Sequence, residues 1–342
     1  MRIEQFDYTL PRSLIAQYPS PQRGDSRLMI LRREDGNIEH RQFKDLADAL
    51  RPGDLLVINN TRVVPVRVIG NKETGGRCEV LLIPSRNGSN GLWKGLIKHS
   101  RGIKKGTRIC FGEDLSGEVE EITRGQVKIR FQGKRDLWSE LARIGHVPLP
   151  PYIKRRDDPL DRERYQTIFA TQDGSIAAPT AGLHFTESHV DSLKAKGLGV
   201  ASITLHVGIG TFMPVRVKEI DEHQMEEEWI EVSEETVADV EKTKEQGGRV
   251  IAVGTTTTRG LESFSDSRGR LRAGSDVSSL FIHPPYRFRV IDGLITNFHL
   301  PKSTLLMLVC AFAGRDLIMR AYEEAVRERY RFYSYGDAML IL

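Results

Sequence analysis

The strongest constraint on the fold is a block of short strand-like segments between residues 62 and 150. In one of them Val127, Ile129 and Phe131 alternate with Lys128 and Arg130, which puts apolar and charged side chains on opposite faces of a strand. Glycine-rich and polar turns separate the segments. The spacing predicts a small antiparallel β-barrel made from residues 62–70, 78–84, 93–98, 108–112, 117–123 and 126–132.

The rest of the chain alternates strand and helix patterns, which indicates an α/β domain with a mixed sheet between two helical layers. Strands are expected at residues 54–58, 200–207, 249–253 and 293–296, and helices at 187–196, 234–246, 303–313 and 316–330. The first strand precedes the barrel and its partners follow it. We therefore predict a discontinuous α/β catalytic domain (1–61 and 151–342) with an inserted β-barrel domain (62–150).

Charge is unevenly distributed along the 342 residues. Residues 62–150 hold 17 Lys and Arg against 9 Asp and Glu, whereas the whole chain has a net charge of only +4. Such a basic segment could neutralise nucleic-acid phosphates, and a lysine-rich soluble surface explains it equally well.

The cysteine count and the apolar runs indicate the cellular compartment in which the protein is expected. Cys78, Cys110 and Cys310 are odd in number and lack metal-site spacing, so we expect three small core residues in a reducing cytoplasm. The longest apolar run, residues 305–314, is about half of the roughly 20 residues that a membrane helix needs. We predict a buried helix there and no membrane partner.

Small, hydroxyl and ionisable residues follow each predicted strand of the α/β domain. Because open α/β sheets bind ligands at the carboxyl ends of their strands, these clusters are the candidate site. They are residues 59–62, 206–212, 254–259 and 297–299, with a fifth cluster, 178–185, before a helix.

Each cluster also has a structural explanation. The threonines after Gly254 could simply end a strand, Gly208 and Gly210 could form a turn or bulge, and His206 and His299 could be hydrogen-bonded core histidines. His223 with Glu226, Glu227 and Glu228 could suggest a metal, but a solvated acidic face is the preferred interpretation, and no metal site is predicted.

Taken together, the clusters resemble the S-adenosylmethionine:tRNA ribosyltransferase-isomerase family of queuosine biosynthesis along essentially the whole chain. The stretches that carry the resemblance are 14–19, 59–63, 178–185, 205–212, 214–216, 252–256, 296–300, 303–305 and 333–338. The resemblance implies transfer and isomerisation of the ribosyl part of S-adenosylmethionine onto 7-aminomethyl-7-deazaguanine at the tRNA wobble position. Epoxyqueuosine forms, and adenine and methionine leave.

The resemblance also suggests roles for residues. A base must remove a proton beside the sulfonium, and the candidates are His206, His299 and His184. The candidate tRNA contacts are Arg62, Lys104, Lys105 and Lys128. The candidate substrate-binding residues are Asn59, Thr61, Thr180, Gly208, Gly210, Thr211, Arg216, Gly254, Thr255, Thr256, Arg259, Asn297, Tyr335 and Asp337, with Arg259 or Arg216 meeting a methionine carboxylate or a tRNA phosphate.

The family further implies a monomer with no cofactor, because S-adenosylmethionine is consumed as the ribosyl donor. At three places the chain departs from the family pattern. These are Glu226 after His223, His283 and Pro285 before the last predicted strand, and the run Thr257, Thr258, Arg259 and Gly260 after Thr256. Two other functions stay open at this point. One is a metal-dependent sugar-phosphate isomerase or lyase, and the other is a non-catalytic tRNA-binding protein.

Overall fold

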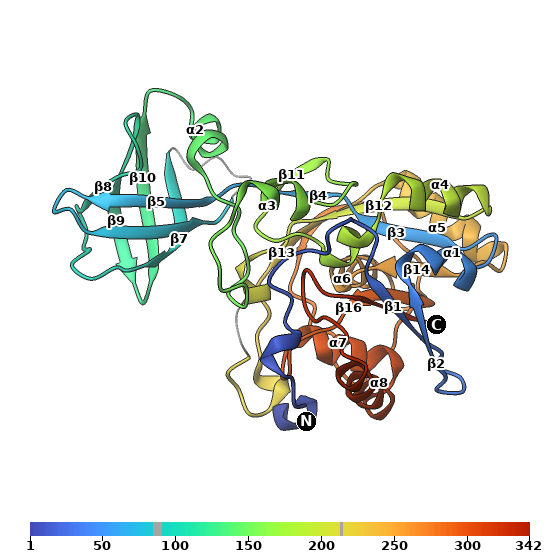
Figure 1. Cartoon of the computed structure of the whole chain (residues 1–342). Helices are drawn as coiled ribbons and strands as arrows, with labels where there is room; N and C mark the ends of the chain where they lie inside the picture. Colours follow the sequence, from blue (N-terminus) through green and yellow to red (C-terminus); the bar gives the residue numbers. More distant parts are fainter. Residues whose placement is uncertain (85–90, 213–214) are drawn as a thin grey trace.

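A computed structural model describes residues 1–84, 91–212 and 215–342. Figure 1 shows a barrel joined side by side to a larger α/β domain that carries both chain termini. The predicted fold class, a mixed-sheet α/β domain with an inserted antiparallel barrel, is confirmed.

The α/β domain is built on a nine-stranded mixed sheet in the order β15-β13-β12-β3-β14-β16-β17-β1-β2. The predicted strands β12, β3, β14 and β16 are neighbours and run parallel. The bounds are β1 (Arg27–Leu31), β2 (Ile38–Gln42), β3 (Leu55–Asn59), β12 (Gly199–Leu205), β13 (Glu228–Val232), β14 (Val250–Val253), β15 (Gly274–Ser278), β16 (Gly293–Asn297) and β17 (Ala338–Ile341).

Alternate side chains of the central strand supply two separate cores. Leu55 and Val57 join the core under α6, α7 and α8, whereas Leu56 and Ile58 join the core under α1 and α4. Both faces of the strand are therefore buried, as a parallel sheet covered by helices requires. The helices are α1 (Leu46–Ala49), α3 (Pro159–Arg164), α4 (Glu187–Ala195), α5 (Glu234–Glu245), α6 (Thr255–Ser263), α7 (Thr304–Ala313) and α8 (Arg315–Arg327).

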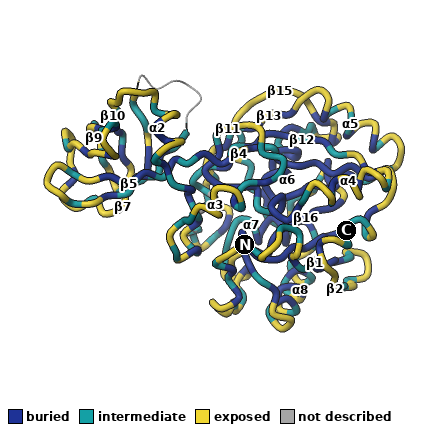
Figure 2. The backbone as a smooth tube through the Cα atoms, turned by 45° about the horizontal axis from the view of Figure 1, so that its top comes forward, coloured by how far each residue is buried: buried dark blue, intermediate teal, exposed yellow. Residues whose placement is uncertain are grey.

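Capping side chains fix where three predicted helices begin. Thr186, Ser233 and Ser303 each accept a hydrogen bond from a backbone N–H three residues further on, at the starts of α4, α5 and α7. Helix α7, which contains the longest apolar run, is buried along most of its length (Figure 2). No helix in the described ranges is long and apolar enough to cross a membrane.

The inserted segment forms a closed six-stranded barrel in the order β10-β7-β6-β5-β8-β9. Val68, Val80, Val119 and Ile129 point inward and are fully buried. A short helix that the sequence pattern did not predict, α2 (Leu137–Ile144), covers one end. The strands are β5 (Arg67–Lys72), β6 (Arg77–Leu82), β7 (Leu92–Lys98), β8 (Arg108–Cys110), β9 (Leu115–Thr123) and β10 (Gln126–Gly133).

Three details differ from the sequence-based expectations. The segment 62–70 is two strands, because β4 (Thr61–Val63) leaves the barrel and pairs in parallel with β11 (Gln172–Ser175). Cys110 is exposed on β8 rather than in a core, although Cys78 and Cys310 are buried as expected. The threonines after Gly254 do not end the strand, since α6 begins at Thr255.

The strap at residues 151–158 joins the barrel to the α/β domain. Asp157 forms an ion pair with Arg67 of β5 and contacts His146 Nδ1 at 3.0 Å. At the other end of the strap, Gln17 donates to the Tyr152 carbonyl at 3.0 Å and accepts from the Lys154 amide at 2.7 Å. The strap therefore touches both domains.

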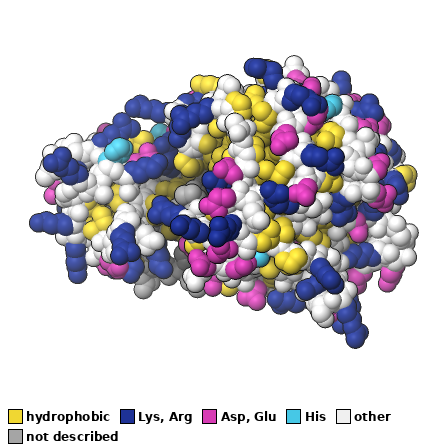
Figure 3. All heavy atoms as spheres, turned by 90° about the horizontal axis from the view of Figure 1, so that it is seen from below, with side chains coloured by type: hydrophobic (Ala, Val, Ile, Leu, Met, Phe, Trp, Pro, Cys, Tyr) yellow, Lys and Arg dark blue, Asp and Glu magenta, His cyan; other side chains and the backbone are white. Residues whose placement is uncertain are grey.

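Seen from below, the molecule is hollowed where the two domains meet, with charged side chains of both signs around the hollow (Figure 3).

Candidate active site

The carboxyl ends of β12, β3, β14 and β16 meet at one edge of the sheet, as the predicted clusters required. A cavity of about 870 Å³ opens there. It is lined by six of the predicted site residues, which are Thr180, Gly254, Thr255 and Thr256 together with Asn297 and His299 from the end of β16. We call it the sheet-edge cavity.

Two helix N-termini face the sheet-edge cavity. Helix α6 starts immediately after Gly254, whose φ of 97° is in the region that favours glycine, and Thr255 and Thr256 form its first turn. Helix α7 starts at Ser303, and Thr304 also lines the cavity. Free backbone N–H groups and the helix dipole make both ends attractive to anionic groups such as a carboxylate.

Three buried polar atoms on residues that line the cavity have no hydrogen-bond partner among the described residues. They are Asn297 Oδ1 and the hydroxyls of Tyr333 and Tyr165, on residues that are about 2%, 5% and 1% exposed. Asn297 is held by its amide, which contacts His184 Nε2 and the Tyr333 carbonyl, both at 3.1 Å. Because unpaired buried polar atoms are costly, an acceptor and two hydroxyls without partners on the residues of one cavity wall indicate a ligand-binding site.

His299 is the candidate base that the structure places in the sheet-edge cavity. Its Nε2 shares a 2.7 Å hydrogen bond with Thr296 Oγ1, and among the described residues its Nδ1 has none. Desolvation by burial lowers its pKa to about 3, so the ring is neutral, and burial by itself makes it a weaker base than a free imidazole.

His184 lies behind the cavity wall. Ser26 Oγ contacts its Nδ1 at 2.7 Å and Asn297 Nδ2 contacts its Nε2 at 3.1 Å, so both ring nitrogens are engaged. Burial lowers its pKa to about 3. This arrangement orients Asn297, so His184 is a positioning residue rather than a group that meets the ligand.

His206 lies outside the sheet-edge cavity. It lines a second cavity of about 1160 Å³ between the barrel and the α/β domain, which we call the interdomain cleft. Thr61 Oγ1 contacts its Nδ1 at 2.8 Å and its ring stacks on Trp229 at 5.0 Å. The sequence pattern placed His206 and His299 together, and the structure separates them.

Arg259 also lies away from the sheet-edge cavity. Its Nη1 donates to Glu228 Oε2 at 2.6 Å and its Nε donates to the Leu280 carbonyl at 3.2 Å. Both charged side chains are about 95% buried or more. The expected solvated acidic face is therefore wrong for Glu228, which is buried on β13, although Glu226 and Glu227 are exposed. The buried cation on α6 explains why the carboxylate can be there.

Several other candidate residues form hydrogen bonds that join parts of the protein to one another. Asn59 bridges to both backbone groups of Leu205 at 3.0 and 3.1 Å and reaches Thr256 Oγ1 at 3.4 Å. Tyr335 donates to Asp161 at 2.6 Å, and Asp337 accepts from the amides of Arg27 and Arg331.

The candidate residues in and near the glycine-rich stretch lie in different parts of the structure. Gly208 lines the interdomain cleft, and its amide donates to Glu228 at 2.9 Å. A Cβ on Gly210 would lie 2.8 Å from that of Glu226. Arg216 is exposed and follows Val215, which lines the sheet-edge cavity. Thr211 falls in a 3-10 turn, η5 (Ile209–Phe212), and its side chain lies outside the described part of the structure.

The candidate tRNA contacts differ in how they are held. Lys104 and Lys105 are exposed in the loop between β7 and β8. Lys128 is in an ion pair with Glu121 at 2.5 Å. Arg62 lines the interdomain cleft and lies 3.7 Å from Asp173.

Tyr152 is a site residue that sequence reasoning missed. It lines the sheet-edge cavity from the strap and stacks on Tyr333 with ring centroids 4.3 Å apart. The prolines around it suggested a domain boundary, and no local pattern could show that this boundary also forms a cavity wall. Among the described residues, no three His, Cys, Asp or Glu side chains gather as a metal site would need.

Comparison with known proteins identifies the family. The family described as "Queuosine biosynthesis protein" matches residues 3–341. Relatives from Syntrophotalea carbinolica and Halothermothrix orenii, both named S-adenosylmethionine:tRNA ribosyltransferase-isomerase, are 52% and 51% identical over 100% of this chain and of their own. The crystal structure of an S-adenosylmethionine tRNA ribosyltransferase from Thermotoga maritima is 40% identical, covers 99% of this chain and 100% of that one, and superposes with a TM-score of 0.56. The chain therefore belongs to the S-adenosylmethionine:tRNA ribosyltransferase-isomerase family of queuosine biosynthesis, a family of transferases.

Proposed function

We propose that the protein transfers and isomerises the ribosyl moiety of S-adenosylmethionine onto 7-aminomethyl-7-deazaguanine at the tRNA wobble position. The product is epoxyqueuosine in tRNA, and adenine and methionine are released. Family membership supports the reaction class, and the sheet-edge cavity supports the choice of donor.

The observation that carries the proposal is the pairing of unpartnered buried polar atoms with two helix N-termini in one cavity. Asn297 Oδ1 suits a ribose hydroxyl or an adenine amine as donor, and the N-termini of α6 and α7 suit the methionine carboxylate. The stacked rings of Tyr152 and Tyr333 offer π faces to the sulfonium cation.

His299 is the base that this site favours. A proton on the ribose carbon beside the sulfonium is unusually acidic, and a neutral imidazole in the cavity wall can accept it. Loss of that proton expels adenine. The amine of the modified base then attacks the opened sugar, and epoxide formation expels methionine from the same carbon skeleton.

No cofactor is required by this proposal, because the donor is consumed in the reaction. We also propose that the protein acts in the cytoplasm, where tRNA and S-adenosylmethionine are available, and that it acts as a monomer.

Adenine release tests the proposed function. Purified protein is mixed with S-adenosylmethionine and an anticodon stem-loop that carries either 7-aminomethyl-7-deazaguanine or guanine, and adenine is measured by chromatography. We expect adenine only with the modified stem-loop. Tight binding of both stem-loops without adenine would contradict ribosyl transfer and favour a tRNA-binding protein.

A further inference from the structure

The interdomain cleft is larger than the sheet-edge cavity and receives side chains from both domains. The barrel domain contributes Trp138 of α2 and Pro84, and the α/β domain contributes His206 and Trp229. Trp138 is 44% exposed, and its ring packs edge-to-face with that of Trp93, with centroids 5.2 Å apart. Exposed aromatic side chains in a cleft of an RNA-binding protein are typical stacking surfaces for unstacked bases.

The charges in the interdomain cleft do not suit a phosphate backbone. Among the described residues, the carboxylates of Asp173 and Glu227 line it, against one guanidinium, that of Arg62; Glu228 also lines it, but the buried Arg259 compensates its charge. Arg62 and Asp173 are 3.7 Å apart and partly exposed, so that pair is weak. An excess of carboxylates would repel phosphates, and it would attract a cation.

The two cavities share a thin wall. Val207 lines both, and the neighbouring residues Ile176 and Ala177 line the interdomain cleft and the sheet-edge cavity respectively. A group that enters one cavity at this wall is therefore separated from the other by little more than a side chain. A reaction between groups held in the two cavities therefore requires the side chains of this wall to move aside.

We propose that the interdomain cleft holds the acceptor base, a 7-deazaguanine turned out of the anticodon stack with its aminomethyl group protonated. Trp138 stacks on the base, and Asp173 and Glu227 bind the ammonium, which must give a proton to one of these carboxylates before the neutral amine attacks the sugar. This inference rests on the proposed function, which names the acceptor, and adds the place where that acceptor binds and the residues that select it.

Flipping a base out of its stack costs a few kcal/mol, which favours an anticodon loop as the substrate, because its bases are unpaired. The carboxylates then give specificity. An unmodified guanine has no cation to offer to Asp173 and Glu227, so binding discriminates before any chemistry occurs.

The test measures RNA affinity rather than turnover. Dissociation constants are determined by fluorescence anisotropy for stem-loops with the aminomethyl base and with guanine, using the wild type, the double variant Asp173→Asn with Glu227→Gln, and Trp138→Ala. We expect the wild type to prefer the modified stem-loop by about tenfold. The double variant should lose this preference and bind the guanine stem-loop at least as tightly as the wild type does, and Trp138→Ala should lose about tenfold for both.

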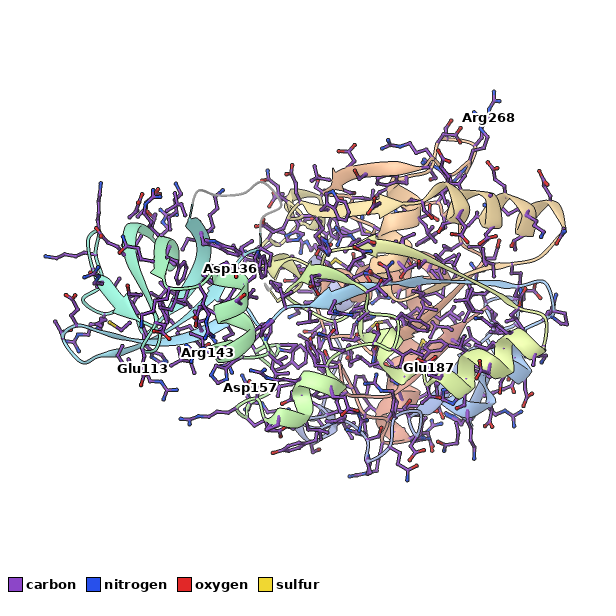
Figure 4. The ribbon with its side chains drawn as sticks, turned by 90° about the horizontal axis from the view of Figure 1, so that it is seen from above. Glu113, Asp136, Arg143, Asp157, Glu187 and Arg268 are labelled. Carbon is purple, nitrogen blue, oxygen red and sulfur yellow. The ribbon has the colours of Figure 1, made fainter. Side chains whose placement is uncertain are left out.

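Matched controls separate the site from general effects. Glu187→Gln removes a carboxylate from α4, at the end of the α/β domain away from the barrel (Figure 4), and should change neither affinity. Trp138→Phe should restore most of the affinity that Trp138→Ala loses. Unchanged affinity of each variant for S-adenosylmethionine would show that the fold is intact.

The inference and the proposed function fail separately. If the double variant keeps the preference, or if Trp138→Ala binds both stem-loops as the wild type does, the acceptor base is bound elsewhere. That result stands even when the wild type releases adenine. If the wild type releases no adenine, the proposed function fails, whatever the RNA affinities are.

Discussion

At the scale of single residues, two buried tyrosines differ in what their hydroxyls contact, so that replacing one should affect stability and replacing the other should affect ligand binding. Tyr330 shares a 2.8 Å hydrogen bond with His40, whereas the Tyr333 hydroxyl has no partner among the described residues and belongs to a cavity-lining side chain. Tyr333→Phe should therefore leave the free energy of unfolding unchanged and lower S-adenosylmethionine affinity by up to about tenfold. Calorimetric titration and urea denaturation measure the two effects.

Tyr330→Phe is the control for that substitution. It should cost roughly 1 kcal/mol of unfolding free energy, because it removes a hydrogen bond, and it should leave S-adenosylmethionine affinity as it was. If Tyr333→Phe bound the donor as the wild type does, its hydroxyl would not face the ligand.

The buried histidines predict how stability depends on pH. Burial lowers the folded-state pKa of His184 to about 3, well below its ordinary value of 6.5. Below pH 6.5 the unfolded chain binds a proton that the folded chain does not, so the free energy of unfolding falls on acidification. His299, with its pKa also lowered to about 3, acts in the same direction. Each contributes up to about 1.4 kcal/mol per pH unit between about pH 6 and pH 4.

His184→Gln isolates one of these contributions. Glutamine keeps a donor for Ser26 and an acceptor for Asn297 but does not titrate. Urea denaturation at about pH 6 and about pH 5 gives the change of the unfolding free energy with pH. This change should be smaller in the variant than in the wild type, by the contribution of nearly one proton. An unchanged slope would mean that His184 is protonated in the folded protein.

At the scale of elements, the Arg259–Glu228 pair joins α6 to β13. Arg259→Met leaves a buried carboxylate without its cation, which should cost about 3–5 kcal/mol of unfolding free energy. Adding Glu228→Gln should recover part of this loss, because the remaining charge is removed. Denaturation of both variants and the double variant measures the coupling. Loss of S-adenosylmethionine binding at unchanged stability would instead support a carboxylate-binding Arg259.

Local patterns predicted the elements whose causes are local. The apolar runs indicated the four parallel strands, and Thr186, Ser233 and Ser303 marked the starts of three helices because each caps its own first turn. The clusters after these strands led to Thr255, Asn297 and His299, which do meet in one cavity.

The features that sequence reasoning missed depend on contacts between distant residues. Glu228 is buried because Arg259, on another element, compensates its charge, and nothing near Glu228 in the sequence shows this. His206 and His299 both follow strands of one sheet, yet the packing of β4 and β11 puts them in different cavities. Likewise, the Tyr333 hydroxyl has no hydrogen-bond partner among the described residues because of how distant residues pack around it, which the local sequence does not show.

At the scale of the whole molecule, the loop between β7 and β8 projects from the end of the barrel that lies away from the α/β domain. A tRNA stem that extends from the interdomain cleft to this loop would therefore lie along the barrel. Lys104 and Lys105 are exposed there, while Lys128 is already paired with Glu121. Lys104→Glu with Lys105→Glu should therefore weaken tRNA binding and reduce the dependence of log affinity on log salt by about 0.7–0.9 for each phosphate that the protein no longer neutralises. Lys128→Glu should have the smaller effect, because its charge is already partly neutralised. Filter binding over a salt series measures both slopes, and equal slopes for the wild type and the double variant would place the stem on another face.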